Sequence, residues 1–183
     1  MIRRCEQLPE NERHGDVTFK GQALTAIGPL LKAGDKAPDF KVLNNALEEE
    51  TLATTRSKIR LIASVPSLDT PVCDMETRMF NKEAVSFGSD VEVLTISMDL
   101  PFAQKRWCAA AGVDRVRTLS DHREASFGKN YGVLVKELRL LQRAIFLVDR
   151  DDIIRYVEYV REIGQEPNYE AVLQQIKHLT GAL

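Results

Sequence analysis

Three hydrophobic runs divide the chain, and each one predicts a buried strand. They extend over Ile59 to Val65, Val91 to Met98 and Arg143 to Asp149. A strand is hydrophobic along its whole length when both faces of its sheet are covered, because every side chain then points into a core. The three runs therefore predict a central sheet with further layers packed on both sides.

Between these strands, hydrophobic residues recur at helical spacing. The spacing predicts one helix over residues 73–87. A second helix is expected with Asp99 as its cap, Pro101 near its start and Gly112 just past its end. Two further helices are expected over residues 123–131 and 168–180.

Shorter elements complete the pattern. Short strands are predicted over residues 17–19, 23–25, 40–43, 116–119 and 153–160. The first two form an N-terminal β-hairpin across a glycine turn, and the last pairs with the preceding strand as a second hairpin. Strands that alternate with helices predict an α/β fold with a mixed central sheet flanked by helices. No linker divides the chain, so residues 17–183 are expected to form one domain after a flexible tail of residues 1–16.

Composition and charge exclude several classes of protein. The chain has 183 residues, of which 44% are hydrophobic and 28% charged, as in a globular domain. The net charge of −2 provides no basic surface for nucleic acid and no polybasic patch for a membrane. No apolar run approaches the roughly 20 residues of a membrane helix. The first 16 residues lack the apolar core of a signal peptide, so a cytoplasmic protein is expected.

The cysteines and histidines do not indicate a structural disulfide or a metal site. There are three cysteines, Cys5, Cys73 and Cys108, and no two of them form a C-x-x-C pair. The three histidines show no metal-ligand spacing, and no glycine-rich phosphate loop is present. The sequence therefore predicts neither a metal nor a cofactor, and any chemistry would come from the cysteines.

The most informative segment is P-S-L-D-T-P-V-C, from Pro66 to Cys73. The preceding strand stops at Pro66, and Asp69 or Thr70 can cap a helix whose first residue is Pro71. Cys73 then lies in the first helical turn, where free amides and the helix dipole favour its thiolate form. An alternative from the residues alone is a buried cysteine that only packs.

Two motifs in the chain resemble those of peroxiredoxins. P-S-L-D-T-P-V-C is similar to the peroxiredoxin pattern P-x-x-x-T-x-x-C, and the segment from Asp99 to Cys108, D-L-P-F-A-Q-K-R-W-C, resembles the second signature of the bacterial thiol peroxidases. These are atypical two-cysteine peroxiredoxins. The resemblance covers residues 17–183, and the departures are Gln142, where a smaller residue is usual, and the tail with Cys5, to which no role is assigned.

The resemblance implies a thioredoxin-like fold with the N-terminal hairpin, a homodimer, and thioredoxin as the reductant. It implies that Cys73 attacks the hydroperoxide and becomes a sulfenic acid. Thr70 would position the peroxide oxygen, although it can also simply cap the helix. Pro66 would shape the pocket, and Arg143 would place its guanidinium beside the sulfur. From the residues alone, Arg143 is more simply a solvated strand end and Pro66 a strand stop.

Cys108 is the resolving cysteine that the resemblance implies, and it would form an intramolecular disulfide with Cys73. Because a disulfide requires Cα atoms about 4.4–6.8 Å apart, both helical segments are expected to unwind locally during turnover. Two alternatives remain at this stage. Cys108 can be structural in a one-cysteine peroxidase, or the protein can be a peroxide sensor that relays oxidation to a partner.

Overall fold

The computed structural model describes residues 11–181, and its helices and strands alternate as an α/β fold requires. Residues 1–10, with Cys5 among them, and residues 182–183 lie outside the described part. The elements are β1 (Glu12–Phe19), β2 (Gln22–Ile27), β3 (Val42–Leu43), β4 (Glu49–Glu50), η1 (Leu52–Thr55), β5 (Ile59–Ser64), α1 (Pro71–Phe87), β6 (Val91–Ser97), α2 (Pro101–Ala111), β7 (Val116–Ser120), α3 (Ser126–Asn130), β8 (Leu134–Val135), β9 (Leu140–Leu141), β10 (Ala144–Val148), β11 (Ile154–Tyr159) and α4 (Tyr169–Thr180).

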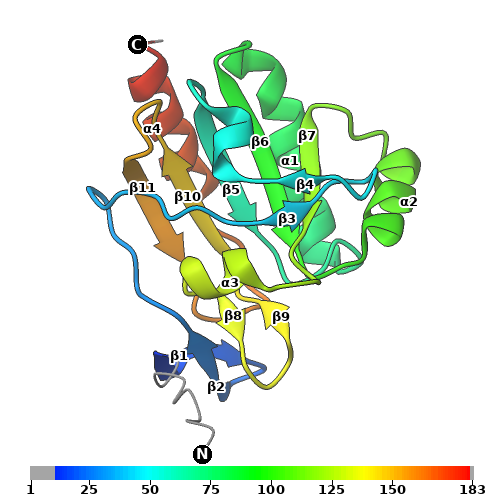
Figure 1. Ribbon diagram of the computed structural model, residues 1–183, viewed down its shortest axis with the longest axis vertical. Helices are drawn as coiled ribbons and strands as arrows, with labels where there is room; N and C mark the ends of the chain where they lie inside the picture. Colours follow the sequence, from blue (N-terminus) through cyan, green and yellow to red (C-terminus); the bar gives the residue numbers. More distant parts are fainter. Residues whose placement is uncertain (1–10, 182–183) are drawn as a thin grey trace, which may run out of the picture.

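The central sheet has seven strands in the order β11-β10-β5-β6-β7-β3-β4. Strands β5, β6 and β7 are parallel, and β10 pairs antiparallel with both β5 and β11. The predicted mixed sheet is therefore confirmed. Helices α1, α2 and α4 pack on one face, whereas α3 and the segment that leads to β3 cover the other (Figure 1).

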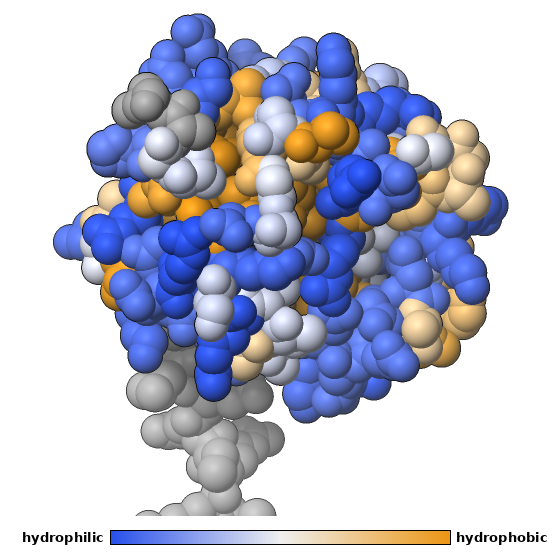
Figure 2. Space-filling model, turned by 90° about the horizontal axis from the view of Figure 1, so that it is seen from above, coloured by the Kyte–Doolittle hydropathy of each residue, from blue (hydrophilic) through white to orange (hydrophobic). Residues whose placement is uncertain are grey.

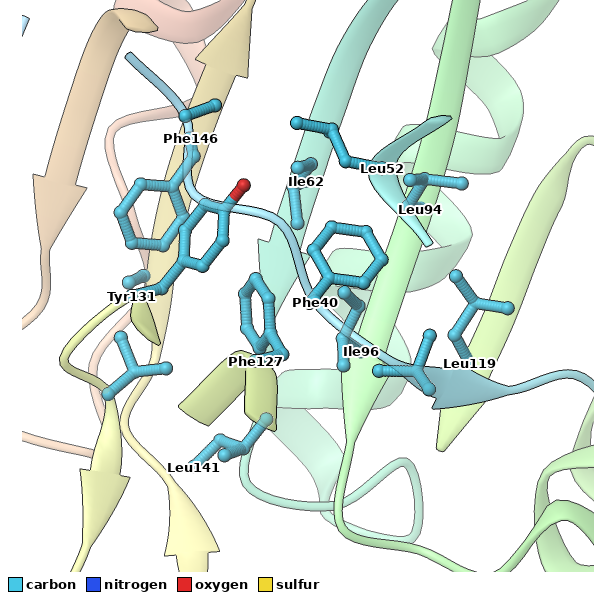
Figure 3. Close-up of a cluster of buried hydrophobic side chains, with 14 of the residues drawn as sticks. Phe40, Leu52, Ile62, Leu94, Ile96, Leu119, Phe127, Tyr131, Leu141 and Phe146 are labelled. Carbon is cyan, nitrogen blue, oxygen red and sulfur yellow. The ribbon is translucent and has the colours of Figure 1, made fainter. Parts of the chain in front are cut away.

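Each face of the sheet has its own hydrophobic core. On the α3 face, Phe40, Phe127, Tyr131 and Phe146 form an aromatic cluster, in which Phe127 stacks on Tyr131 at 4.5 Å between ring centroids (Figure 3). On the other face, residues of α1, α2 and α4 pack against β5, β6 and β10, and this core includes Cys73. The strands are buried on both sides, which explains their uninterrupted hydrophobic pattern.

The N-terminal hairpin is longer than predicted. Strand β1 begins at Glu12, so the prediction of a tail through residue 16 is wrong for residues 12–16. These residues alternate in burial and pair with β2, with an irregular register between His14 and Val17. The hairpin joins β8 and β9 in a separate four-stranded sheet. Residues 12–16 are all polar or glycine, so the sequence has no hydrophobic alternation there that would extend the predicted strand.

Helix α3 is shorter than the predicted helix over residues 123–131. It begins only at Ser126, because Ala125 has a left-handed backbone with φ of 52°. The buried Asp121 carboxylate accepts hydrogen bonds from the amides of Phe127 and Gly128. That contact satisfies amides of the first turn, and the residues before Ala125 form a turn instead of a helix.

A hydrophobic hollow lies at the end of the molecule where α1 and α4 finish (Figure 2). Its lining includes Phe87, Leu173 and Ile176, and its volume is about 140 Å³. Cys73 lies near the start of α1, about 21 Å away along the helix axis. The hollow therefore belongs to a different region from the segment that carries Cys73.

Candidate active site

Cys73 is buried in the first turn of α1. Strand β5 ends at Ser64, a short loop follows, and the helix begins at Pro71 with Thr70 as its N-cap residue. Cys73 is 0% exposed, and the loop before it includes the buried Pro66. The local structure thus matches the predicted strand, loop and helix, with the thiol at the helix start.

The Thr70 hydroxyl points to the sulfur and does not cap the helix. Its Oγ1 lies 2.8 Å from Sγ of Cys73 and 3.0 Å from the carbonyl oxygen of Ser67. The predicted side-chain cap is absent at Thr70, the N-cap position of α1. A hydroxyl has a single proton, so two arrangements are possible. Thr70 donates to Cys73 when the sulfur is a thiolate, or it accepts from the Cys73 thiol and donates to the carbonyl oxygen of Ser67.

Arg143 reaches the same sulfur from the other side. Its Nη2 donates to Sγ of Cys73 at 3.2 Å and to the carbonyl oxygen of Ile163 at 3.4 Å. Arg143 directly precedes β10 and is 1% exposed, so the interpretation as a solvated strand end is wrong. The structure thus brings Thr70, Cys73 and Arg143 together, with Pro66 in the adjoining loop.

Glu76 is a member of the site that sequence reasoning missed. It lies one turn after Cys73 on α1, is 0% exposed, and pairs with Nη1 of Arg143. Burial raises the pKa of Glu76 to about 7, against the Arg143 guanidinium, which lowers it. The signal in the sequence was a carboxylate three residues from Cys73, on the helix face that carries the thiol.

Two neighbours hold the Arg143 guanidinium in place, the Glu76 carboxyl group and the Cys73 sulfur. Burial lowers the pKa of Arg143, but Glu76 and Cys73 raise it, and the net shift is upward. The side chain therefore remains a cation beside the sulfur. Glu76 occupies one terminal nitrogen and leaves the other for Cys73, which fixes the plane of the guanidinium.

The loop before Cys73 is anchored by Asp99. The Asp99 carboxylate accepts hydrogen bonds from Ser67 Oγ, the Leu68 amide and Ser97 Oγ, each at 2.8 Å. The prediction that Asp99 caps α2 is wrong, because Leu100 is the N-cap residue of that helix. The carboxylate instead fastens the loop of the peroxiredoxin-like motif to the carboxyl end of β6.

Cys108 lies apart from this constellation. It is on α2 and half-buried, and its Sγ lies 3.3 Å from Oγ1 of Thr118 on β7. It borders an open hollow of about 410 Å³ that Asn45, Glu50 and Thr118 also line. Within residues 11–181, Cys73 and Cys108 are both free thiols.

The comparisons with known proteins agree with this geometry. A family model described as Redoxin matches residues 32–173. The chain belongs to the redoxin family. This redoxin is similar to the thiol peroxidase of Oceanobacillus iheyensis, at 56% identity over 161 residues, 88% of this chain and 98% of the relative. It is also similar to the thiol peroxidase of Bacillus subtilis, at 53% identity over 164 residues, 90% of this chain and 98% of the relative.

Solved structures support the same assignment. The crystal structure of a peroxiredoxin-like protein from Aquifex aeolicus matches with a TM-score of 0.84 and 40% identity, and covers 91% of this chain and 98% of that one. The resemblance to thiol peroxidases and the thioredoxin-like fold with its N-terminal hairpin are thus confirmed. This redoxin is an enzyme of the thiol peroxidase type, a peroxiredoxin.

The described residues contain neither a metal-binding cluster nor a helix that could span a membrane. In this part of the chain, no three or more His, Cys, Asp and Glu residues are grouped so that they could hold a metal ion. None of the helices between residues 11 and 181 has the length and hydrophobicity needed to cross a membrane.

Proposed function

We propose that this redoxin reduces hydrogen peroxide and organic hydroperoxides through a two-cysteine cycle. Reduction of peroxides as such follows from its assignment as a thiol peroxidase. The observation that supports the mechanism is the position of the Cys73 sulfur between the Thr70 hydroxyl and the Arg143 guanidinium. Both groups can donate a hydrogen bond to the sulfur, so both can also donate to an oxygen that approaches it.

In the first step, the Cys73 thiolate attacks the terminal oxygen of the hydroperoxide. The S–O bond forms as the O–O bond breaks, which gives a Cys73 sulfenic acid and an alkoxide or hydroxide that takes a proton from solvent. Arg143 stabilises the negative charge that develops on the leaving oxygen. Thr70 orients the attacked oxygen, and Pro66 keeps the start of the loop buried.

In the second step, the Cys108 thiol attacks the sulfenic sulfur. The disulfide forms and water leaves, so both electrons for the peroxide come from the two thiols. Cys73 contacts Arg143, next to β10, and Cys108 contacts Thr118 on β7. Strands β10 and β7 are three strand spacings apart in the sheet, which is about 14 Å. Local unwinding of both segments is therefore part of the cycle.

In the third step, the dithiol of thioredoxin reduces the disulfide and becomes oxidised itself. A reducing compartment, the cytoplasm, is the setting that such a cycle requires.

The proposal also includes a homodimer. Leu100 and Phe102, at the start of α2, are 52% and 68% exposed, and exposed hydrophobic side chains of this size are typical of interfaces.

The test is intact mass and a free-thiol count on dilute reduced protein after one equivalent of an organic hydroperoxide. The proposal predicts the loss of two thiols and a peptide that joins Cys73 to Cys108. In Cys108→Ser, turnover with thioredoxin should stop after one oxidation. A stable Cys73 sulfenic acid with Cys108 still free, or full turnover by the variant, would favour the one-cysteine or sensor alternative.

A further inference from the structure

The residue after Cys73 and the residue before Cys108 are hydrogen-bonded to each other. Nε1 of Trp107 donates to Oδ1 of Asp74 at 3.1 Å. Trp107 is the only tryptophan in the chain and is 9% exposed, so its indole N–H needs a partner within the protein. The bond directly joins the two segments whose cysteines must meet.

Arg78 reinforces this contact. Its Nε donates to Oδ2 of Asp74 at 2.9 Å, and its guanidinium lies 5.7 Å from the centroid of the Trp107 ring. Its Nη1 donates to the carbonyl oxygen of Ala111, the last residue of α2, at 2.8 Å. The Arg78 side chain thus spans the gap between α1 and the C-terminal end of α2.

Asn81 continues the same face of α1. Its Oδ1 accepts hydrogen bonds from the amides of Asp114 and Arg115, at 3.2 and 2.7 Å. Asp74, Arg78 and Asn81 follow one another at helical spacing, so they form a single polar seam along α1. The seam holds the chain from Trp107 to Arg115, with Cys108 inside the held segment.

We propose that the contacts of Asp74 and Arg78 with α2 form a latch that sets the rate of disulfide formation. The inference rests on the proposed Cys73–Cys108 disulfide. Sγ of Cys108 now lies beside Thr118, so it reaches Cys73 only if the segment around Trp107 leaves its place. That movement breaks the Trp107 bond to Asp74 and the Ala111 bond to Arg78.

The latch also determines how often the enzyme is inactivated. The Cys73 sulfenic acid has two fates. It condenses with the Cys108 thiol and releases water, or it attacks a second hydroperoxide, which gives a sulfinic acid and one molecule of alcohol or water. A tighter latch slows the first reaction and leaves the second unchanged. Loosening the latch therefore favours the disulfide.

The test compares Asp74→Ala and Trp107→Phe with two controls. Asp74→Asn keeps a side-chain oxygen that accepts the indole N–H. Glu83→Ala removes a half-buried carboxylate from the same helix, outside the seam. Reduced proteins are mixed with increasing concentrations of an organic hydroperoxide and quenched at intervals. Mass spectrometry then gives the fractions of sulfenic acid, disulfide and sulfinic acid, and circular dichroism verifies that each variant is folded.

We expect disulfide formation to be about three- to tenfold faster in Trp107→Phe, which loses one hydrogen bond, and at least as fast in Asp74→Ala, which loses this bond and the bond from Arg78. The sulfinic fraction should fall by a similar factor, and the rate of the first oxidation should not change. The double variant should be no faster than Asp74→Ala, because Trp107→Phe removes a bond that Asp74→Ala has already removed. Glu83→Ala should resemble the wild type. Asp74→Asn should fall between the wild type and Asp74→Ala, because it keeps an acceptor for the indole N–H but loses the charge that pairs with Arg78.

Equal disulfide rates in the wild type and in both folded latch variants would overturn the latch while the two-cysteine cycle stands. A parallel loss of all rates would show that the seam only supports the fold. Absence of any Cys73–Cys108 disulfide in the wild type would instead overturn the proposed function, and the latch with it.

Discussion

Nη2 of Arg143 lies 3.2 Å from Sγ of Cys73, and both residues are buried. The contact joins the first turn of α1 to the residue before β10, across the core that α1 shares with the sheet. A cation in a water-excluded position interacts strongly with an anion, because little solvent screens it. The contact therefore places the Arg143 charge where it acts directly on the sulfur and on charge that develops beside it.

The first prediction concerns removal of the Arg143 charge. Arg143→Gln should lower the second-order rate of Cys73 oxidation by roughly 100-fold or more, as loss of a preorganised donor to a developing oxyanion does. The rate of Arg143→Lys should fall between those of this variant and the wild type. Lysine keeps the positive charge but lacks the two terminal nitrogens with which Arg143 binds Glu76 and Cys73 at once. Stopped-flow measurement of thiol oxidation provides the rates.

The matched control is Arg150→Gln, which removes an exposed arginine paired with Asp90. It should oxidise at the wild-type rate. If Arg143→Gln, once shown to be folded, also oxidises at that rate, the guanidinium has no part in the chemistry.

The second prediction concerns the pH dependence of stability that Glu76 imposes. Burial raises its pKa from 4.5 to about 7, so the native state binds more protons than the unfolded state in this window. The contribution of Glu76 to the free energy of unfolding therefore falls as pH rises through the window. Glu76→Gln does not titrate and should lose this slope in urea unfolding between about pH 5 and about pH 8.

Near pH 5 the variant should have a free energy of unfolding close to that of the wild type, because Glu76 is then protonated and neutral, as glutamine is. The two curves should separate only as the pH rises through about 7, where the wild type loses stability and the variant does not. Glu83→Gln on the same helix should retain the wild-type slope. Parallel curves for the wild type and Glu76→Gln would contradict the upward pKa shift.

The third prediction separates the two uses of the Thr70 hydroxyl. Thr70→Val keeps the shape of the side chain but removes the hydroxyl, and should slow Cys73 oxidation by about 10- to 100-fold, the value of a hydrogen bond to a charged group. Thr70→Ser keeps the hydroxyl and should remain within a few-fold of the wild type. A purely structural hydroxyl would lower thermal stability in Thr70→Val without changing the oxidation rate.

Local signals predicted the part of the site that α1 carries. A hydrophobic strand, Pro66, a threonine and Pro71 in sequence are enough to place Cys73 in the first turn of a helix. These signals act over a few residues, and the structure has the helix start at Pro71. The mixed sheet was predictable for a related reason, because strands covered on both faces are hydrophobic throughout.

Contacts between segments that are distant in the sequence could not be predicted from local patterns. Periodicity does not show that Arg143 meets Cys73, and only the family resemblance indicated it. Glu76 resembled an ordinary helix carboxylate, because its burial depends on Arg143 across the core. Asp99 was misread as a helix cap, since its true partners, Ser67 and Leu68, lie on a loop far away in the sequence. In each of these three cases, a polar side chain has its partner on another element.

The fourth prediction is that oxidation loosens two helical segments. In the reduced form, Sγ of Cys73 is held by Thr70 and Arg143, while Cys108 is held beside Thr118. A disulfide between them requires Cα atoms within about 7 Å. Helical amides around both cysteines must therefore lose their hydrogen bonds in the oxidised form, and exchange their protons for deuterium faster.

Hydrogen exchange with mass spectrometry should show faster exchange over residues 70–76 and 104–111 in the oxidised protein, and unchanged exchange over β10. Cys108→Ser treated with one equivalent of hydroperoxide provides the matched control. It stops at the sulfenic acid and should keep residues 104–111 protected, because no disulfide pulls on α2. Unchanged protection of both segments in the oxidised wild type would mean that the two sulfurs meet without unwinding, or do not meet at all, and the thiol count separates these two cases.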